Sequence, residues 1–432
     1  MKKFTPILAI ILTLGMHFES FSQTGPGGVG SSSNLETWVN ASHLSLSNND
    51  LVTSWTDFSG NVNNADQVDV SKQPVFLTNQ INGLPAVSFD GVNDYLDFSS
   101  SITATATTIF TVVRPTSSNY MSILAIDNHH ISYGGATIRA EFPTGKLQAT
   151  KSQSFSVSTM YTDAEALSAT SVFLKNSTAS FNRSRTGFYN NLNNSIGSLF
   201  FSGSNKFFFQ GEMAEIIVFN EELNLARRNI ISNYLAAKYN LNTSPNLYSF
   251  KATHGEEVIG VGQEVGGSHI LSRGLDSIQI SNPSSLNNGD YLIIGSDGGS
   301  YAVSGDVGSL VSQRWTRTWR PDITGTPGTV DITFYLGNND FAVDPNEYAL
   351  YIENGDGIFS NGATSIHQTG MAYDALNKTV TFTGVPLTNG CYFTLAELSS
   401  SPPPPPSDPI SFGPGGVGTT GNIDIWVKAD EL

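Results

Sequence analysis

The chain has 432 residues, with 21 Lys and Arg against 37 Asp and Glu, so its formal net charge is −16. This acidic balance excludes nucleic acid as an expected partner, because phosphate binding needs a basic surface, and it disfavours anionic membranes. Charged residues make up only 13% of the chain, and Gly is abundant at 41 residues, which is typical of short strands joined by many turns.

The first residues predict an export signal. Two lysines precede an apolar run over residues 7–14, and small residues lie at −3 and −1 if cleavage occurs before Gln23. The run is too short to span a bilayer, which takes about 20 residues. We therefore expect a signal peptide at residues 1–22 and a Gly/Ser-rich lead-in at 23–33. The mature protein is expected to be secreted or held at the cell surface, without a transmembrane segment.

The next segment, residues 34–245, carries one β pattern that ends in a helix. Residues 107–114 (TTIFTVVR) predict a strong strand that ends at Pro115. Further apolar strands are expected at residues 86–89, 206–210 and 215–219. From Asn220, which can cap a helix, apolar residues recur at helical spacing as far as Ala237. This helix is expected to close the domain by packing one apolar stripe on a sheet.

Three segments of this domain carry a resemblance to a known family. They read WTDFSGN at residues 55–61, QINGLPAVSFDGVNDYL at 80–96 and GEMAEIIVFN at 211–220. In this order they resemble a laminin-G-like domain of the concanavalin A-like lectin and glucanase superfamily. The resemblance implies a jelly roll of two antiparallel sheets. The superfamily includes lectins, adhesion modules and glycan hydrolases, so the fold alone leaves the function open.

The turn that follows residues 86–89 is the candidate metal site. Asp90, Asn93 and Asp94 offer carboxylate and amide oxygens, which are the ligands that Ca²⁺ prefers. The resemblance adds to this interpretation, because laminin-G-like modules often hold one calcium at the rim of the sandwich. The same residue types are also common in turns, where they bond to their own backbone. Both interpretations stay open, and calcium is the one cofactor expected.

No catalytic pattern can be assigned from the sequence. Retaining glucanases of this superfamily place two carboxylates on one strand face, about 5–5.5 Å apart, and the alternating spacing that this needs is not found here. Asp163 and Glu165 are two residues apart but lie in a loop-like stretch. His129 and His130 would face opposite sides of a strand, and no third zinc ligand stands out. A binding function is therefore favoured over an enzyme.

Residues 246–398 predict a second β-sandwich domain without a long helix. Strands are expected at 290–295, 330–336, 348–352 and 379–383, with Asn-Gly and Asp-Gly turns between them. This part resembles, more loosely, the β domain that often follows laminin-G-like modules in surface proteins of Gram-negative bacteria, and the resemblance implies no activity. The only cysteine of the chain, Cys391, lies among apolar residues and is expected to be a buried thiol.

One segment of this second domain is chemically distinctive, because residues 314–320 read RWTRTWR. On a single strand, Trp315, Arg317 and Trp319 would share one face, with the guanidinium stacked between two indoles. Such a ladder can brace a fold. Where the indoles are exposed, it can instead stack on the faces of sugar rings, and these three residues are therefore the candidate ligand-binding residues.

The last residues repeat an earlier segment. Residues 25–44 (GPGGVGSSSNLETWVNASHL) and 413–432 (GPGGVGTTGNIDIWVKADEL) agree at 11 of 20 positions. Five prolines precede the second copy, and such a run forms a stiff polyproline II spacer. We expect a Pro-rich linker at residues 399–412 and the truncated start of a second laminin-G-like repeat at residues 413–432.

The sequence as a whole predicts an all-β protein: a laminin-G-like jelly roll with one C-terminal helix, followed by a second β-sandwich. Export, tandem repeat and linker favour an extracellular, non-catalytic binding module of a multidomain bacterial surface or adhesin-like protein. Its ligand would be a glycan or a surface protein. The alternative is a module of a secreted glycan-degrading hydrolase, or such a hydrolase itself.

Overall fold

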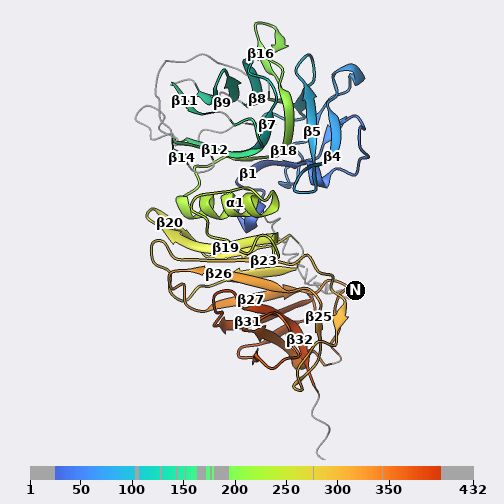
Figure 1. Cartoon of the computed structure of the whole chain (residues 1–432), viewed down its shortest axis with the longest axis vertical. Helices are drawn as coiled ribbons and strands as arrows, with labels where there is room; N and C mark the ends of the chain where they lie inside the picture. Colours follow the sequence, from blue (N-terminus) through green and yellow to red (C-terminus); the bar gives the residue numbers. More distant parts are fainter. Residues whose placement is uncertain are drawn as a thin grey trace, which may run out of the picture.

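The computed structural model describes residues 25–399, except 103–106, 127–128, 143–144, 151, 163–171, 176–177, 180–193, 276 and 343. The expectations for residues 1–22 and 413–432, for the linker beyond residue 399, and for Asp163 and Glu165 therefore fall outside the described residues. Two β units stand end to end, with helix α1 (Leu225–Lys238) between them (Figure 1). The predicted all-β class, with one helix closing the first unit, is confirmed for the described residues.

The first unit is a sandwich of two antiparallel sheets. One sheet has the order β14-β13-β12-β7-β18-β5-β4 with β1 also paired to β18, and the other has the order β11-β10-β9-β8-β15-β6-β3-β2. The hairpin β16–β17 stands apart from both. The strands are β1 Leu35–Asn40, β2 Ser54–Trp55, β3 Ala65–Asp66, β4 Val75–Ile81, β5 Leu84–Asp90, β6 Leu96–Phe98, β7 Thr107–Pro115, β8 Met121–Ile126, β9 His129–Gly134, β10 Thr137–Phe142, β11 Gly145–Thr150, β12 Ser156–Thr162, β13 Val172–Lys175, β14 Thr178–Ala179, β15 Ser195–Ile196, β16 Leu199–Phe201, β17 Ser204–Lys206 and β18 Gln210–Phe219.

Strand β7 shows why its sequence is apolar at almost every position. Ile109 and Val113 point into the core between the two sheets. Phe110 and Val112, on the opposite face, belong to a second core that lies beneath α1. A strand covered on both faces has no solvent side, so β-branched and aromatic residues run without alternation. The strand predicted at residues 107–114 is confirmed.

Helix α1 begins later than the sequence predicts. Its cap is Asn224, whose side chain accepts a hydrogen bond from the Arg227 backbone N–H at 2.9 Å. Asn220 instead follows directly on β18, and its backbone N–H donates to the Asn34 carbonyl at 3.0 Å. The prediction that Asn220 caps the helix was therefore wrong by four residues, because that residue is used to end the strand.

The second unit also consists of two antiparallel sheets. Their orders are β20-β19-β23-β26-β32-β25-β24, with β28 joining β32 to β29, and β21-β22-β27-β31-β30. The strands are β19 Glu256–Glu264, β20 Gly267–His269, β21 Leu271–Arg273, β22 Ile278–Ser281, β23 Tyr291–Ser296, β24 Val303–Ser304, β25 Val311–Trp315, β26 Trp319–Thr324, β27 Val330–Tyr335, β28 Tyr348–Glu353, β29 Thr364–His367, β30 Ala372–Asp374, β31 Thr379–Val385 and β32 Tyr392–Leu398. Cys391 is buried, as predicted, and burial raises the pKa of its thiol.

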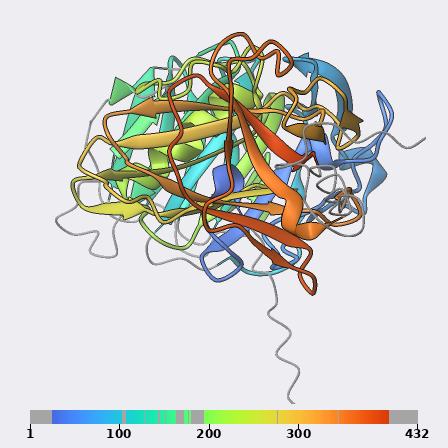
Figure 2. The ribbon, with the colours of Figure 1, turned by 90° about the horizontal axis from the view of Figure 1, so that it is seen from below.

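Helix α1 belongs to both units, which the sequence did not predict. Tyr239 donates to Glu215 of the first unit at 2.7 Å, and Asn229 donates to Tyr291 of the second at 2.9 Å. One continuous core, the junction core, joins residues of the first unit, the helix and the second unit, among them Trp38, Phe110, Ile217, Ile230, Leu235, Val258, Tyr291 and Ile293. Viewed along the long axis, the two units lie one above the other (Figure 2).

The glycine-rich start of the described chain is packed into the same junction. In η1 (Pro26–Gly28), Gly27 and Gly28 have φ of 67° and 75°, which glycine adopts without strain. A Cβ on Gly28 would lie 2.0 Å from Ser272 Oγ, so no larger residue fits there. Ser272 Oγ donates to the Gly27 carbonyl at 3.0 Å, and His269 Nε2 lies 3.2 Å from the Gly28 carbonyl oxygen. The GPGGVG motif thus ties the chain to the second unit.

Candidate functional site

The RWTRTWR segment does not form the predicted ladder. Strand β25 ends at Trp315 and β26 begins at Trp319, so the three residues between them interrupt the strand. The Arg317 guanidinium lies 4.4 Å from the centroid of the Tyr301 ring, and its Nη1 donates to Glu257 at 2.7 Å. The prediction that this guanidinium stacks between two indoles on one strand face was therefore wrong.

Both indoles of this segment are fully buried. Trp315 and Trp319 are 0% exposed, and their ring centroids lie 6.4 Å apart. Both indoles pack against further aromatic rings in the core of the second unit. The centroid of the Trp315 ring lies 5.0 Å from that of Tyr301, 5.8 Å from Phe334 and 5.9 Å from Phe341. The centroid of the Trp319 ring lies 6.0 Å from that of Phe393. Because neither ring face reaches the surface, Trp315 and Trp319 brace the core and offer no platform to a sugar.

The Asp90–Asp94 turn is held by its own side chains. Asp90 Oδ1 accepts the backbone N–H groups of Val92, Asn93 and Asp94 at 2.7, 3.2 and 3.4 Å, and Asp94 Oδ2 accepts that of Asp90 at 2.9 Å. The Asn93 amide donates to the Ser71 carbonyl at 2.7 Å. These bonds explain the turn without a metal. They leave Asp90 Oδ2, Asn93 Oδ1 and Asp94 Oδ1 as ligands for a cation, fewer than the six to eight oxygens that Ca²⁺ takes.

No group of three or more His, Cys, Asp and Glu side chains that could hold a metal is found in the part of the chain that the structure describes. Burial raises the pKa of the Asp94 carboxyl to about 6, against the hydrogen bond from the Asp90 backbone, and the negative charge of Asp90 raises it further. Calcium at Asp90, Asn93 and Asp94 stays a prediction.

A cavity of about 380 Å³ opens beside this turn. We call it the Tyr95 cavity; it is lined by Lys72, Asn93, Tyr95, Asp97, Phe200, Asn205 and Phe208. Three segments far apart in the sequence meet here: η3 (Val70–Lys72), the turn into β6, and the hairpin β16–β17. In Figure 1 the hairpin projects at the end of the first unit farthest from the second unit.

The lining of the Tyr95 cavity combines aromatic rings with polar acceptors. The Tyr95 and Phe208 rings lie 6.3 Å apart with an angle of 38° between their planes, and both are only half-buried. Phe200 pairs with Asn205 across the hairpin, which places the two side chains on the same face. The Oδ1 atoms of Asp97 and Asn205 are buried and have no hydrogen-bond partner in the protein. Burial also raises the pKa of the Asp97 carboxyl.

Comparison with known proteins leaves the function open. A family model described as a domain of unknown function (DUF8202) matches residues 263–391, which lie within the second unit. No curated protein matches the chain.

Three of the similar solved structures show how distant the likenesses are. Domain 4 of AbnA, a GH43 extracellular arabinanase from Geobacillus stearothermophilus in complex with arabinotriose, is 12% identical over 46% of this chain and 96% of its own, with a TM-score of 0.32. A GH54 α-L-arabinofuranosidase soaked with a cyclic sulfate inhibitor is 15% identical over 54% and 61%, with a TM-score of 0.32. The receptor binding domain of botulinum neurotoxin mosaic serotype C/D is 10% identical over 85% and 94%, with a TM-score of 0.34. At these TM-scores the likenesses carry no argument.

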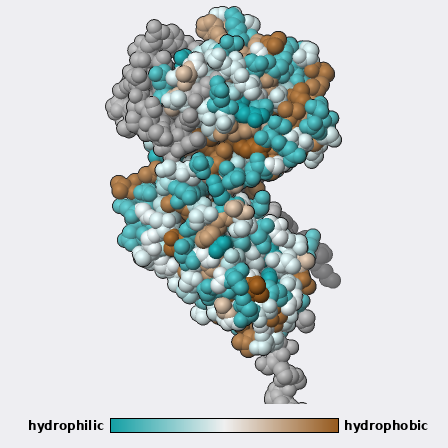
Figure 3. Space-filling view, in the orientation of Figure 1, coloured by the Kyte–Doolittle hydropathy of each residue, from teal (hydrophilic) through white to brown (hydrophobic). Residues whose placement is uncertain are grey.

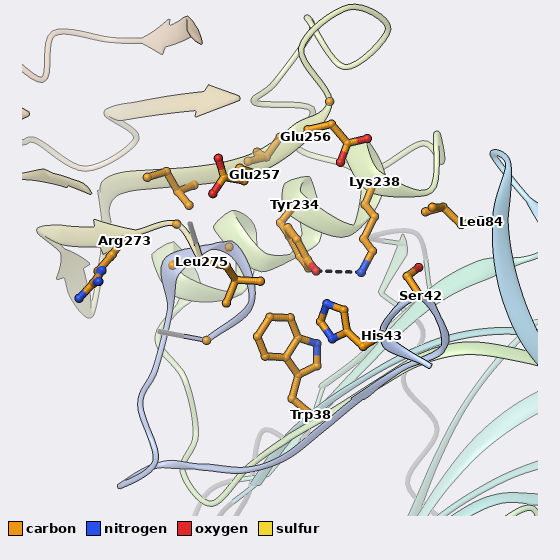
Figure 4. Close-up of a pocket in the computed structure, with 17 residues that line it drawn as sticks. Trp38, Ser42, His43, Leu84, Tyr234, Lys238, Glu256, Glu257, Arg273 and Leu275 are labelled. Atoms are coloured by element: carbon orange, nitrogen blue, oxygen red, sulfur yellow. Dashed lines mark hydrogen bonds between the residues drawn. The ribbon is translucent and has the colours of Figure 1, made fainter. Parts of the chain in front are cut away.

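A second cavity, of about 300 Å³, lies at the junction of the two units. In the space-filling view the molecule narrows to a waist there, and hydrophobic residues gather along it (Figure 3). Figure 4 shows Trp38, His43, Tyr234 and Lys238 around this cavity. Lys238 Nζ donates to Tyr234 Oη at 3.1 Å and to Glu215 Oε2 at 2.9 Å.

The polar groups around Glu215 satisfy one another at this junction. Glu215 is 0% exposed and also accepts hydrogen bonds from Trp38 Nε1 at 2.6 Å, Tyr239 Oη at 2.7 Å and Tyr234 Oη at 3.2 Å. A buried carboxylate with an ion pair and three neutral donors is fully paired. We therefore assign these residues to holding α1 on the first unit, and place the candidate binding site at the Tyr95 cavity.

His130 belongs to a buried polar network. Its Nε2 lies 3.0 Å from Ser122 Oγ and its Nδ1 lies 4.0 Å from Glu141 Oε2, the order of a serine nucleophile, a base and an orienting carboxylate. Ser122 is 0% exposed, however, and its hydroxyl donates to the Ser198 carbonyl at 2.8 Å. Burial lowers the pKa of His130 to about 3. A nucleophile must reach its substrate, so this network is structural.

Sequence reasoning missed the residues that line the Tyr95 cavity. It predicted a strand over residues 206–210, whereas β17 ends at Lys206 and β18 begins at Gln210. The run of aromatic residues on either side of Ser202-Gly203 is a signal that could have marked a projecting hairpin. Its meeting with residues 93–97 depends on tertiary packing that no local pattern encodes.

Proposed function

We propose that this protein is an extracellular, non-catalytic glycan-binding module whose ligand occupies the Tyr95 cavity. The observation that carries the proposal is that half-buried aromatic rings and unpartnered buried acceptors line one cavity. Export and a place in a larger surface protein rest on the predicted signal peptide and repeat. Among the described residues no helix is both long and apolar enough to cross a membrane.

The chemistry of the cavity fits a sugar in two respects. The C–H face of a pyranose is apolar and packs on aromatic rings such as Tyr95 and Phe208, whereas its hydroxyls need acceptors such as the side chains of Asp97 and Asn205. A buried acceptor left unpaired costs about 1–3 kcal/mol, which a ligand donor recovers. The volume lies in the range of small-molecule sites, roughly 300–1,000 Å³.

The hairpin β16–β17 offers a matched test. Phe200 lines the cavity, whereas Phe201, the next residue, faces the other way and is 42% exposed. On a glycan array and by calorimetry with the glycans that bind, Phe200→Ala should weaken binding by at least about tenfold, a loss of about 1.4 kcal/mol. Phe201→Ala should leave binding unchanged. Equal effects of the two substitutions, or binding of no glycan by the unaltered protein, would contradict the proposal.

Glycan hydrolysis is the second candidate, and one observation favours it. Asp66 of β3 and Asp97 of β6 are directly opposite in the strand register, so their carboxylates share a face. Directly opposite residues have Cβ atoms about 4.5–5.5 Å apart, close to the separation that a retaining glycosidase needs. Asp66 does not line the cavity, which favours binding without cleavage. Release of reducing ends from a bound glycan, abolished by both Asp66→Asn and Asp97→Asn, would establish the hydrolase instead.

A further inference from the structure

The surroundings of the Tyr95 cavity are strongly acidic. Four carboxylates, which we call the acidic rim, lie on the segments that form it: Asp69, Asp90, Asp94 and Asp97. The turn and η3 are tied together, since the Tyr95 backbone N–H donates to the Lys72 carbonyl at 3.2 Å. Among the described residues of the lining, Lys72 is the cation, and it is ion-paired with Asp69 at 2.8 Å. Lys206, also on the hairpin, lies 5.8 Å from the centroid of the Phe201 ring.

Asp97 is the carboxylate of this rim that lines the cavity itself. An ionised carboxylate only accepts hydrogen bonds, so the side chain of Asp97 is complementary to a hydroxyl or an ammonium group. A carboxylate or sulfate on a sugar would bring a second acceptor and a second negative charge to the same place. Like charges repel strongly where water is partly excluded, and the ammonium group of Lys72 is shared with Asp69.

We propose that the Tyr95 cavity selects sugars by charge, with protonated amino sugars bound most tightly, neutral sugars next, and sugars that carry carboxylate or sulfate groups rejected. This inference rests on the proposed glycan binding and adds the class of ligand. The negative formal charge of the whole chain, −16, acts in the same direction at longer range.

The test is calorimetry of the full chain with three oligosaccharides of equal length, made of glucosamine, glucose or glucuronic acid. It is done at low ionic strength and at a pH where the amine is protonated. Each step in the order should change the dissociation constant by about tenfold, and added salt should compress the differences. Asp97→Asn should remove most of the difference between the neutral and acidic sugars. Glu256→Gln removes a charge from the second unit and should leave the order unchanged.

The outcomes separate this inference from the proposed function. If none of the three oligosaccharides and no glycan on the array binds, the glycan-binding proposal fails. If sugars bind but the uronate binds as tightly as the neutral sugar, only the charge selection fails. If the order holds but persists in Asp97→Asn, the assignment to this carboxylate is overturned.

Discussion

Two aromatic clusters of this protein look alike in composition and differ in what covers them. Trp315 and Trp319 lie at the ends of adjoining strands in the middle of the second unit, and both are 0% exposed. Tyr95 and Phe208 lie where a turn meets a projecting hairpin, and both are only half-buried. The first pair packs against further aromatic rings on both sheets, whereas the second lines a cavity together with the polar side chains of Asp97 and Asn205.

The difference shows that residue type and spacing do not decide whether an aromatic cluster binds a ligand. A period of two identifies a strand face, but not the layer that packs against that face. In the second unit the opposite sheet covers the indoles. At the Tyr95 cavity the strands are short and the sandwich ends, so aromatic rings stay partly open to solvent.

The largest expected effect is a loss of stability when one of the two buried tryptophans is replaced. Trp315→Ala should lower the free energy of unfolding by about 3–5 kcal/mol, because it leaves a large hole in a packed aromatic core. Denaturant titration measures the loss, and glycan affinity per folded molecule should not change. If the Trp315→Ala variant kept its normal stability but no longer bound glycan, Trp315 would have to be a ligand-binding residue.

The second effect concerns the junction and its pH dependence. Burial, the charge of Arg227 and, in the opposite direction, the hydrogen bond to Gly28 set the pKa of His269 to about 4, below its ordinary 6.5. The neutral imidazole is thus favoured in the folded state. Its contribution to stability is present above pH 6.5 and is lost as the pH falls from 6.5 towards 4.

We therefore expect the free energy of unfolding to fall by up to about 3 kcal/mol from this one residue as the pH decreases over this range. Denaturant titrations at several pH values measure the change as a shift of the midpoint. His269→Gln should flatten the dependence. His367, which is half-buried on β29, provides the control in His367→Gln. An unchanged slope in His269→Gln would show that other groups drive the acid sensitivity.

A third expected effect concerns the half-buried pair, Tyr95 and Phe208, where substitution should affect glycan binding more than stability. Phe208→Ala should weaken glycan binding by at least about tenfold while the free energy of unfolding changes by less than about 1–2 kcal/mol. Calorimetry and denaturant titration on the same sample separate the two quantities. A large loss of stability with intact binding would mean that Phe208 acts as a core residue, like the tryptophans.

The smallest expected effect concerns calcium. If Asp90 and Asp94 bind Ca²⁺, a concentration ten times the dissociation constant should raise the free energy of unfolding by about 1.4 kcal/mol. Asp90→Asn should abolish the rise. Asp356 bonds to its own turn in a similar way but lies in the second unit, so Asp356→Asn is the control. Equal denaturation midpoints with calcium and with a chelator would show that this turn does not bind calcium.

Local sequence predicted the elements whose residues agree with one another. The β-branched run at residues 107–114 forms β7 because both of its faces are covered, and Cys391 is buried among apolar neighbours. The helix was found, but not its start, because Asn220 and Asn224 are both good caps and only the end of β18 decides between them.

The candidate site was beyond local reasoning. Asp97 and Asn205 are more than a hundred residues apart, and they meet because the hairpin β16–β17 folds over the edge of β6. The Asp90–Asp94 turn, which the sequence did single out, lies at the rim of the same cavity, through Asn93. The sequence analysis thus identified a turn beside the cavity. The residues that line the cavity come together only through tertiary packing.

The packing of the GPGGVG motif has a mechanical consequence. Residues 27 and 28 are bonded to β20 and β21, and β32 ends at Leu398 in the same unit, so both ends of the described chain are fixed to the second unit. Tension applied between residues 25 and 399 would therefore be borne by the junction and the second sandwich. The first unit, with the Tyr95 cavity at its far end, would stand beside the line of force as an unloaded side branch, able to keep its shape while the protein is pulled (Figure 1).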